Sequence, residues 1–400
     1  MSVPAGSKGG FVKPLIDTGM NVKEFSRNIS SIASRYNLSK VKTLGLYIND
    51  FCNLSCRHCY YTRPDYLNPD SITAERLIPI LRSAINSGVK LFAFVGKEIF
   101  IPGEHIGEKT IKTMEFLNEQ KSAGYDIMIG AVTNGTLIDR FFHELKKFKI
   151  DYIDFSIDGP DPETHEYLRG KNTFYKTIKN MKNAIENSIA DKIFVSSTLF
   201  SQNLNNLINI LDFRCKFDVK FFNITPIVAI KGDHLAISLK DLINFISNLQ
   251  EKILKLNHDV NVVIDLDSYI VHSSLEYLPE PFDTLTVKID KLNNLILINE
   301  INKSTLSIRI SLPDPCSGYA CISTEGLYFN KGGCLFMNQN YKKLAFDSAL
   351  NSNIENIIKN HENLSLSILT SPEINIFSEA SDEILNKIEK GKRYELPKIK

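Results

Sequence analysis

The chain has 400 residues, of which 43% are hydrophobic and 23% are charged, a composition typical of a globular protein rather than a disordered or fibrous one. Lysine and arginine number 47 and aspartate and glutamate number 46, so the formal net charge is +1. This near balance argues against a broad basic surface for nucleic acid or for an anionic membrane.

Neither an export signal nor a membrane span is visible in the sequence. The N-terminal segment MSVPAGSKGGFVKPL lacks the apolar core of a signal peptide. No apolar stretch approaches the ~20 residues that a membrane-spanning helix needs. We therefore expect a cytoplasmic protein, in which the 7 cysteines indicate metal binding or redox chemistry rather than disulfide bonds.

Short apolar runs alternate with longer segments of helical periodicity over residues 42–235. The apolar runs predict six strands, at residues 43–49, 90–96, 126–134, 152–158, 192–200 and 219–229. The segments between them predict five helices, at residues 72–88, 107–124, 137–148, 173–188 and 203–213. This alternation indicates an α/β fold built from βαβ units around a parallel sheet. Six units fall short of an eight-stranded TIM-type barrel, which leaves a partial barrel and an open sheet as alternatives.

Four further parts flank this region. They are an N-terminal extension, a connecting helix with several strands, a loop-like region with three cysteines, and a polar, helix-prone tail; their ranges are 1–41, 236–312, 313–345 and 346–400. Within the connecting part, the pattern predicts a helix at 241–256 and a strand at 261–267.

Chemically distinctive residues directly follow the predicted strands instead of preceding them. Cys52 to Cys59 follow the first strand and Gly96 to Glu98 the second, while Thr133 to Gly135 and Ser156 to Gly159 follow the third and fourth. The carboxyl ends of parallel strands meet at one edge of a sheet, where ligands bind. The sequence therefore predicts a single site at that edge.

Cys52, Cys56 and Cys59 form a C-x3-C-x2-C pattern. Three thiolates on one loop can hold a [4Fe–4S] cluster and leave one iron open to a substrate or cofactor. A structural zinc site, with His58 or a distant cysteine as the fourth ligand, is the alternative. Usual zinc spacings come as two separated pairs, so this pattern favours iron and sulfur.

The run from Cys52 to Tyr60, CNLSCRHCY, resembles the cluster loop of the radical S-adenosylmethionine (radical SAM) superfamily. The resemblance implies that Cys52, Cys56 and Cys59 hold a [4Fe–4S] cluster whose open iron binds S-adenosylmethionine. It also implies that His58 lies near the adenine and that the backbone of Tyr60 touches the adenine edge. The activity implied is reductive cleavage of S-adenosylmethionine to a 5′-deoxyadenosyl radical, which abstracts hydrogen from a substrate.

Further motifs match the same superfamily in order. Gly96-Lys97-Glu98 stands where Gly-Gly-Glu is usual, which implies that this segment and the Glu98 carboxylate receive the methionine ammonium; Lys97 is a departure. The turn at Asn134 resembles the family's strand-three turn. Ser156 and Asp158 match positions that bind the ribose hydroxyls or the methionine carboxylate.

The stretch from Ser156 to Gly170 resembles anaerobic sulfatase-maturing enzymes and peptide maturases with a SPASM- or twitch-type extension. By this match Arg169 pairs with the carboxylate of S-adenosylmethionine. The fold implied is a partial (β/α)6 TIM-type barrel with a cysteine-containing C-terminal extension.

Three late cysteines, Cys316, Cys321 and Cys334, fit the position of that extension but not its usual content. Relatives carry seven cysteines for two auxiliary clusters, so at most one auxiliary iron–sulfur cluster is expected here. The alternatives are buried or uncommitted thiols and a zinc site. Cys215 is predicted to be a core residue.

The sequence as a whole predicts a radical SAM oxidoreductase that matures a ribosomally synthesised precursor peptide through a crosslink, a thioether, epimerisation or oxidation. The expected partners are the peptide, a separate leader-recognition protein and an electron donor such as flavodoxin or ferredoxin, without nucleic acid or membrane. A radical SAM enzyme acting on a small molecule and a non-catalytic metal-binding regulator are the alternatives. The sequence indicates no catalytic residue beyond the cofactor site.

Overall fold

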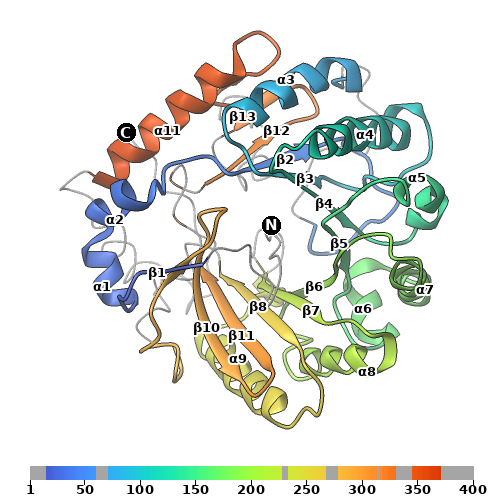
Figure 1. The fold of residues 1–400 in the computed structure, drawn as a ribbon. Coiled ribbons are helices and arrows are strands. Elements are labelled where there is room, and N and C mark those ends of the chain that lie inside the picture. The colour runs from blue at the N-terminus through green and yellow to red at the C-terminus, as the bar shows by residue number, and fades with distance from the viewer. Residues whose placement is uncertain are drawn as a thin grey trace.

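The computed structural model describes residues 15–59, 71–227, 233–266, 278–310, 312, 316, 318–329 and 345–370. Its centre is a parallel sheet whose strands are β2 (Thr43–Tyr47), β3 (Leu91–Val95), β4 (Met128–Thr133), β5 (Tyr152–Ser156), β6 (Ile193–Leu199) and β7 (Phe221–Pro226). Each of these strands pairs in parallel with the next along the chain. The sheet curls into a partial barrel (Figure 1), which confirms the α/β class and all six predicted strands.

Helices cover the outer face of this curled sheet (Figure 1). Three predicted helices are confirmed as α3 (Ala74–Asn86), α4 (Lys109–Ser122) and α7 (Phe174–Glu186). Strands β2 and β3 are buried along their whole length because one face meets these helices and the other faces the barrel interior. This double burial explains why their sequences are almost continuously apolar.

Two predicted helices are wrong in their length and type. Residues 137–148 contain only η2 (Ile138–Phe141) and α5 (Phe142–Leu145), and residues 203–213 give way to η3 (Leu207–Asp212) and α8 (Phe213–Phe217). In the second case the Asn203 side chain accepts from the Phe200 N–H, and the Asn206 amide donates to Asp161 and Thr164. Asparagine side chains that bond to nearby groups in this way compete with regular helix formation.

One helix near the predicted site was not expected, α6 (Pro162–Arg169). Its Asp161 N-cap accepts from the Thr164 N–H, proline occupies the first helical turn, and the helix ends at Gly170. These are ordinary start and stop signals for a helix. The helix matters because it carries Arg169 to the pocket described below.

Segments outside 42–235 extend the same sheet rather than forming separate layers. The connecting region supplies α9 (Leu239–Leu254), β8 (Asn261–Leu266), β9 (Lys288–Ile289), β10 (Leu295–Ile301) and β11 (Ser304–Ile310). Strand β8 pairs in parallel with β7, and β11 in parallel with β8. The predicted helix at 241–256 and strand at 261–267 are thereby confirmed.

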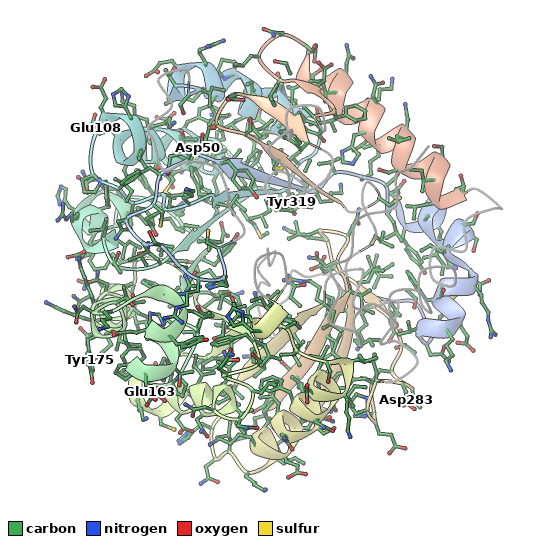
Figure 2. The ribbon with its side chains drawn as sticks, turned by 180° about the vertical axis from the view of Figure 1, so that it is seen from behind. Asp50, Glu108, Glu163, Tyr175, Asp283 and Tyr319 are labelled. Atoms are coloured by element: carbon green, nitrogen blue, oxygen red, sulfur yellow. The ribbon has the colours of Figure 1, made fainter. Side chains whose placement is uncertain are left out.

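The cysteine-containing region is also part of the sheet. The loop-like prediction for this region is wrong for β12 (Tyr319–Ile322) and β13 (Leu327–Phe329), because β12 pairs in parallel with β2 and β13 pairs with β12. Strand β14 (Asp347–Ser348) completes this edge. Figure 2 shows Tyr319 of β12 toward the inside of the curled sheet, whereas Glu163 and Tyr175 lie on the outer rim.

The two ends of the described chain pack together. The N-terminal part contains β1 (Ile16–Asp17), α1 (Val22–Arg27) and α2 (Ile29–Tyr36), and the C-terminal part contains α11 (Ile354–Thr370). Helix α11 contacts both α2 and α3, and Glu362 on α11 accepts from the Lys40 ammonium and the Val41 N–H. The remaining short elements are η1 (Glu104–Glu108) and η4 (Asp233–Leu235). In the described ranges, no helix combines the length and the apolar character needed to cross a bilayer.

The inner wall of the barrel is formed by side chains that alternate along the strands. Tyr152 at the start of β5 packs in this wall next to Gly130 of β4, where a Cβ atom would overlap the Tyr152 ring. Gly130 is therefore needed for the close approach of the ring to the neighbouring strand.

We expect Gly130→Ala to lower the free energy of unfolding by about 1–3 kcal/mol, because the Tyr152 ring has to leave its place in a packed wall. Urea unfolding measures the change. In a Tyr152→Leu background the same substitution should cost clearly less, and an equal cost in both backgrounds would contradict this explanation.

Candidate functional site

A pocket opens at the carboxyl ends of the parallel strands, where the sequence predicts the site. Its lining residues come from the loops after β2, β3 and β4, from the ends of β5, β6 and β7, and from α6: Cys52, Leu54, Cys56, His58, Cys59, Val95, Gly96, Lys97, Val132, Thr133, Asn134, Asp154, Ser156, Arg169, Ser196, Ser197, Thr198, Thr225, Pro226 and Ile227. Residues far apart in the sequence are thereby brought together by the sheet.

The cysteine loop is held in place at both of its ends. At its start, the Asn49 side chain donates to the Glu98 carbonyl at 2.5 Å and accepts from the Phe51 N–H. Near its end, the Arg57 N–H donates to the Leu168 carbonyl at 2.8 Å, and the Arg57 guanidinium lies 4.5 Å from the centre of the Tyr167 ring. The loop is thus fastened to β3 on one side and to α6 on the other.

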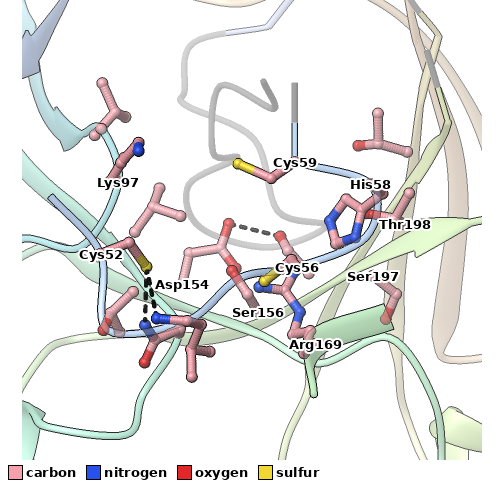
Figure 3. A pocket seen from close by; sticks show the side chains of 18 of the residues that line it. Cys52, Cys56, His58, Cys59, Lys97, Asp154, Ser156, Arg169, Ser197 and Thr198 are labelled. Carbon is pink, nitrogen blue, oxygen red and sulfur yellow. Dashed lines mark hydrogen bonds between the residues drawn. The ribbon is translucent and has the colours of Figure 1, made fainter. Parts of the chain in front are cut away.

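The thiols of Cys52, Cys56 and Cys59 surround one cavity (Figure 3). In the part of the chain that the structure describes, no group of three His, Cys, Asp or Glu side chains is closed around a point that could hold a metal ion. The three thiols are spread around the pocket instead. The sulfur ligands of a zinc ion lie ~2.3 Å from the metal, so a single ion requires thiols that are close together. A cluster of several irons fills more space and can be held by thiols that lie farther apart.

Burial sets the protonation of two of these thiols. It raises the pKa of Cys52 to about 12, an effect that the Glu98 carboxylate adds to. Burial also raises the pKa of Cys56 to about 11, although the Arg169 guanidinium opposes the rise. Buried thiols of this kind stay protonated at neutral pH, so binding of a metal centre has to release their protons.

Donors near Cys52 are already oriented toward its sulfur. The Leu54 N–H lies 3.4 Å from the Cys52 Sγ, and the Asn134 amide lies 3.8 Å from it. The Asn134 amide also donates to Asn53. Hydrogen bonds to cluster sulfurs are among the features that tune iron–sulfur centres, and the surroundings of Cys52 fit such a centre.

Arg169 reaches the pocket from the end of α6 and is fixed by Asp158. The Arg169 Nε donates to Asp158 Oδ2 at 2.6 Å, and the Thr198 N–H donates to Asp158 Oδ1 at 2.8 Å. Burial by itself would raise the pKa of Asp158, but the adjacent guanidinium lowers it below its ordinary value. Asp158 is therefore an ionised anchor for Arg169 and β6.

Asp158 lies behind the pocket lining, and its contact with S-adenosylmethionine stays a prediction. Its side chain is fully buried, both of its oxygens are occupied, and it is absent from the pocket lining. The local reason is the buried guanidinium next to it, which would be unpaired without this carboxylate.

The contact of Glu98 with the methionine ammonium likewise stays a prediction. The Glu98 carboxylate is fully buried and accepts from the Thr133 hydroxyl and from the N–H groups of Asn134 and Phe100. It therefore stabilises the turn after β4 and lies behind the pocket lining.

The other predicted cofactor contacts that the structure describes do line the pocket: His58, Gly96, Lys97, Asn134, Ser156 and Arg169. Burial lowers the pKa of His58 to about 4, so this ring is neutral, and its Nδ1 has no hydrogen-bond partner among the described residues. Gly96 has a φ of 131°, a conformation that favours glycine. Tyr60 lies outside the described residues.

The late cysteines are not brought together as far as the structure describes them. Cys316 packs in the outer core beside α11, with its Sγ 3.9 Å from the Ser365 carbonyl. Cys321, on β12, packs in the inner wall, which is a different cluster. Cys334 lies outside the described residues. The prediction that Cys215 is a core residue is wrong, because Cys215 is exposed on α8.

Several pocket residues were missed by sequence reasoning. They are Asp154, which shares the inner face of β5 with the predicted Ser156, and Ser196 and Thr198, which share the inner face of β6. Alternation along a strand could have found them, because residues two apart face the same side. Because Ser156 is predicted to face the site, the same alternation predicts that Asp154, two residues earlier on the strand, faces it too.

Comparison with known proteins agrees with this geometry. Residues 46–214 match the family model of the Radical SAM superfamily. These residues form a radical SAM domain. The superfamily uses a [4Fe–4S] cluster and S-adenosylmethionine, and the domain contains the cysteine loop, the turns after β3 and β4, and Arg169.

Curated relatives share part of this chain. A probable GTP 3′,8-cyclase of Methanosarcina mazei is 27% identical over 180 residues, which are 44% of this chain and 51% of that protein. The GTP 3′,8-cyclase of Peptoclostridium acidaminophilum is 24% identical over 148 residues, 36% of this chain and 43% of that protein. The chain thus spans about half the length of the curated relatives it matches.

Solved structures share the fold over a longer stretch. SuiB of Streptococcus suis, bound to S-adenosylmethionine, has a TM-score of 0.61 at 17% identity, over 86% of this chain and 71% of that chain. The structure of anSMEcpe with bound AdoMet and a Cp18Cys peptide has a TM-score of 0.58 at 16% identity, over 87% of this chain and 94% of that chain. The common fold therefore extends beyond the radical SAM domain of this chain.

We expect Asp158→Asn to lower the free energy of unfolding by about 3 kcal/mol at neutral pH, because the Arg169 guanidinium is then buried without a counter-charge. Folding lowers the pKa of Asp158. The stabilisation that its carboxylate adds to the folded state is therefore complete above about pH 4 and is lost as the pH falls through the lowered pKa. Urea unfolding across this pH range measures both effects. Glu163→Gln, on the exposed side of α6, is the matched control and should change little.

Proposed function

We propose that this protein is a radical SAM enzyme in which Cys52, Cys56 and Cys59 hold a [4Fe–4S] cluster and Arg169 binds the carboxylate of S-adenosylmethionine. The observation that carries the proposal is one pocket lined by three thiols of a single loop and by a fixed guanidinium. When bound, the cluster and S-adenosylmethionine supply a 5′-deoxyadenosyl radical that abstracts hydrogen from a C–H bond.

The protein's own residues orient the cofactor. Asp158 holds the Arg169 guanidinium, which can offer its remaining N–H groups to a carboxylate. Ser156 and Thr198 present hydroxyl groups to the same pocket, and the neutral His58 ring supplies a flat wall suited to an adenine. The loop around Cys52 keeps donors directed at its sulfur.

For the substrate we propose a peptide, in line with the sequence prediction. Support comes from the fold shared with SuiB, whose structure with the precursor peptide SuiA has a TM-score of 0.60, and with anSMEcpe, whose structure contains a peptide. The proposed modification is a crosslink, a thioether, an epimerisation or an oxidation of that peptide.

A nucleotide is the second candidate, because the curated relatives are named GTP 3′,8-cyclases. A triphosphate needs several cationic donors. Among the described residues that line the pocket, the lysine and arginine side chains are those of Lys97 and Arg169, and Asp158 already pairs with Arg169. Two cationic side chains, one of them already paired with a carboxylate, are few for a triphosphate, and this favours the peptide as the substrate.

The proposal includes partners and a location. An electron donor such as flavodoxin or ferredoxin has to reduce the cluster, and a separate protein would recognise the leader part of the peptide. A cluster held by thiolates needs reducing surroundings, so we place the enzyme in the cytoplasm.

The first test is turnover of S-adenosylmethionine by the anaerobically reconstituted protein. We expect dithionite and S-adenosylmethionine to yield 5′-deoxyadenosine with the wild type and none with Cys59→Ala, because the third cluster ligand is lost. Cys215→Ala, which removes an exposed thiol on α8, is the control and should match the wild type. Turnover retained by Cys59→Ala would overturn the site assignment.

The second test concerns the expected auxiliary cluster at Cys316, Cys321 and Cys334. We expect about four irons per chain and no loss of iron in a variant with all three replaced by alanine, because the two described thiols pack in different core clusters. Iron and sulfide analysis with Mössbauer spectra measures this. About eight irons per chain, falling to about four in the variant, would contradict this expectation and show that these cysteines hold an auxiliary cluster.

A further inference from the structure

A polar patch lies on the inner wall of the barrel, on strands that carry no cysteine ligand. It consists of Asp154 on β5, Ser196 on β6 and Asn223 on β7. The Ser196 hydroxyl donates to Asp154 Oδ2 at 2.6 Å, and the Asn223 amide nitrogen lies 3.3 Å from the Ser196 oxygen. Asp154 and Ser196 line the same pocket as the thiols. Figure 3 shows Asp154 on this wall, with the thiols around the same cavity.

Two oxygen atoms of this patch are buried without a hydrogen bond. They are Asp154 Oδ1 and Asn223 Oδ1, and neither has a partner in the described part of the chain. Asp154 is 0% exposed and Asn223 is 3% exposed. A buried acceptor without a donor costs free energy, and Asp154 lines the pocket, so its unpaired oxygen indicates a ligand that supplies donors.

The charge around these atoms is negative. Arg309 of β11 is the cation near Asp154, but it is bound through two hydrogen bonds to Asp265 of β8, at 2.9 and 2.6 Å. The charge of Arg309 is therefore largely balanced by Asp265. Burial raises the pKa of Asp154 to about 6, while Ser196, Arg309 and Arg169 oppose the rise. At about pH 8 the carboxylate is ionised and lacks a counter-charge of its own.

We propose that Asp154 binds a cationic group of the substrate, an ammonium or a guanidinium such as a lysine or arginine side chain of a peptide. An ammonium carries three donors and a guanidinium five, any of which can bond to the unpaired Asp154 oxygen. The proposal rests on the proposed function in that the patch lines the radical-generating pocket. It also makes the patch a specificity site, because an anionic substrate group would be repelled there.

The binding can be tested without knowing the substrate. The probes are n-butylammonium and n-butylguanidinium, with n-butanol as the neutral control, and saturation-transfer NMR is recorded on the reconstituted protein with S-adenosylmethionine at about pH 8. We expect both cations, but not n-butanol, to bind the wild type. Asp154→Asn should weaken binding of the cations by about tenfold or more, because a hydrogen bond to a charged group is lost.

Asp191→Asn is the matched control. It removes the same charge at an exposed position before β6, at the opposite end of the barrel, and should leave binding of the cations unchanged. Asp154→Ser is a second variant that also removes the carboxylate, and it is expected to weaken binding of the cations even if Asp154→Asn folds poorly. Equal binding of n-butylammonium to the wild type and to a folded Asp154 variant, or no binding to the wild type, would overturn the proposal.

The two proposals can fail separately. If the wild type releases no 5′-deoxyadenosine but binds n-butylammonium through Asp154, the proposed function fails and the cation site remains. If 5′-deoxyadenosine is released and Asp154→Asn binds the cations as well as the wild type does, the cation site fails and the proposed function remains.

Discussion

The buried ion pair between Asp158 and Arg169 is the interaction on which the rest of the site depends. Asp158 follows β5, also accepts from the backbone of Thr198 on β6, and donates its own N–H to the His165 ring of α6. The carbonyl of Leu168, beside Arg169, accepts from Arg57 in the cysteine loop. One pair thus joins two strands, a helix and the loop of the thiols. Since an unpaired buried charge is costly, these elements are held in one arrangement before any cofactor binds.

The sequence predicts the central sheet well because its strands are buried on both faces, and such strands are apolar along their whole length. It predicts the helices less well where polar side chains act locally. At Asn203 and Asn206, hydrogen bonds to neighbouring loops replace a regular helix. It misses the role of residues 319–322 as a strand, because pairing with β2 is a long-range contact that local pattern does not show.

The site is predictable where residue type and chemistry agree, as for the thiols and Arg169. It is less predictable for carboxylates, because a buried carboxylate takes whatever donors the fold offers. Glu98 is occupied by the turn after β4 and Asp158 by Arg169, whereas Asp154, which no motif marks, keeps an oxygen that lacks a partner. Motif position indicates that a residue is near the pocket. Only the hydrogen bonds decide whether its side chain faces the pocket or supports it.

The pocket is therefore unequal on its two sides. The wall from β2 to β4 carries the thiols together with the apolar side chains of Val95 and Val132. The wall from β5 to β7 carries Asp154, Ser196 and Thr198, which can hold polar groups. An enzyme that forms a reactive species has to keep the species apart from its own polar machinery and yet fix the substrate close by. Placing the thiols and the Asp154 carboxylate on different strands of one curled sheet meets both needs, because the sheet fixes the distance between them.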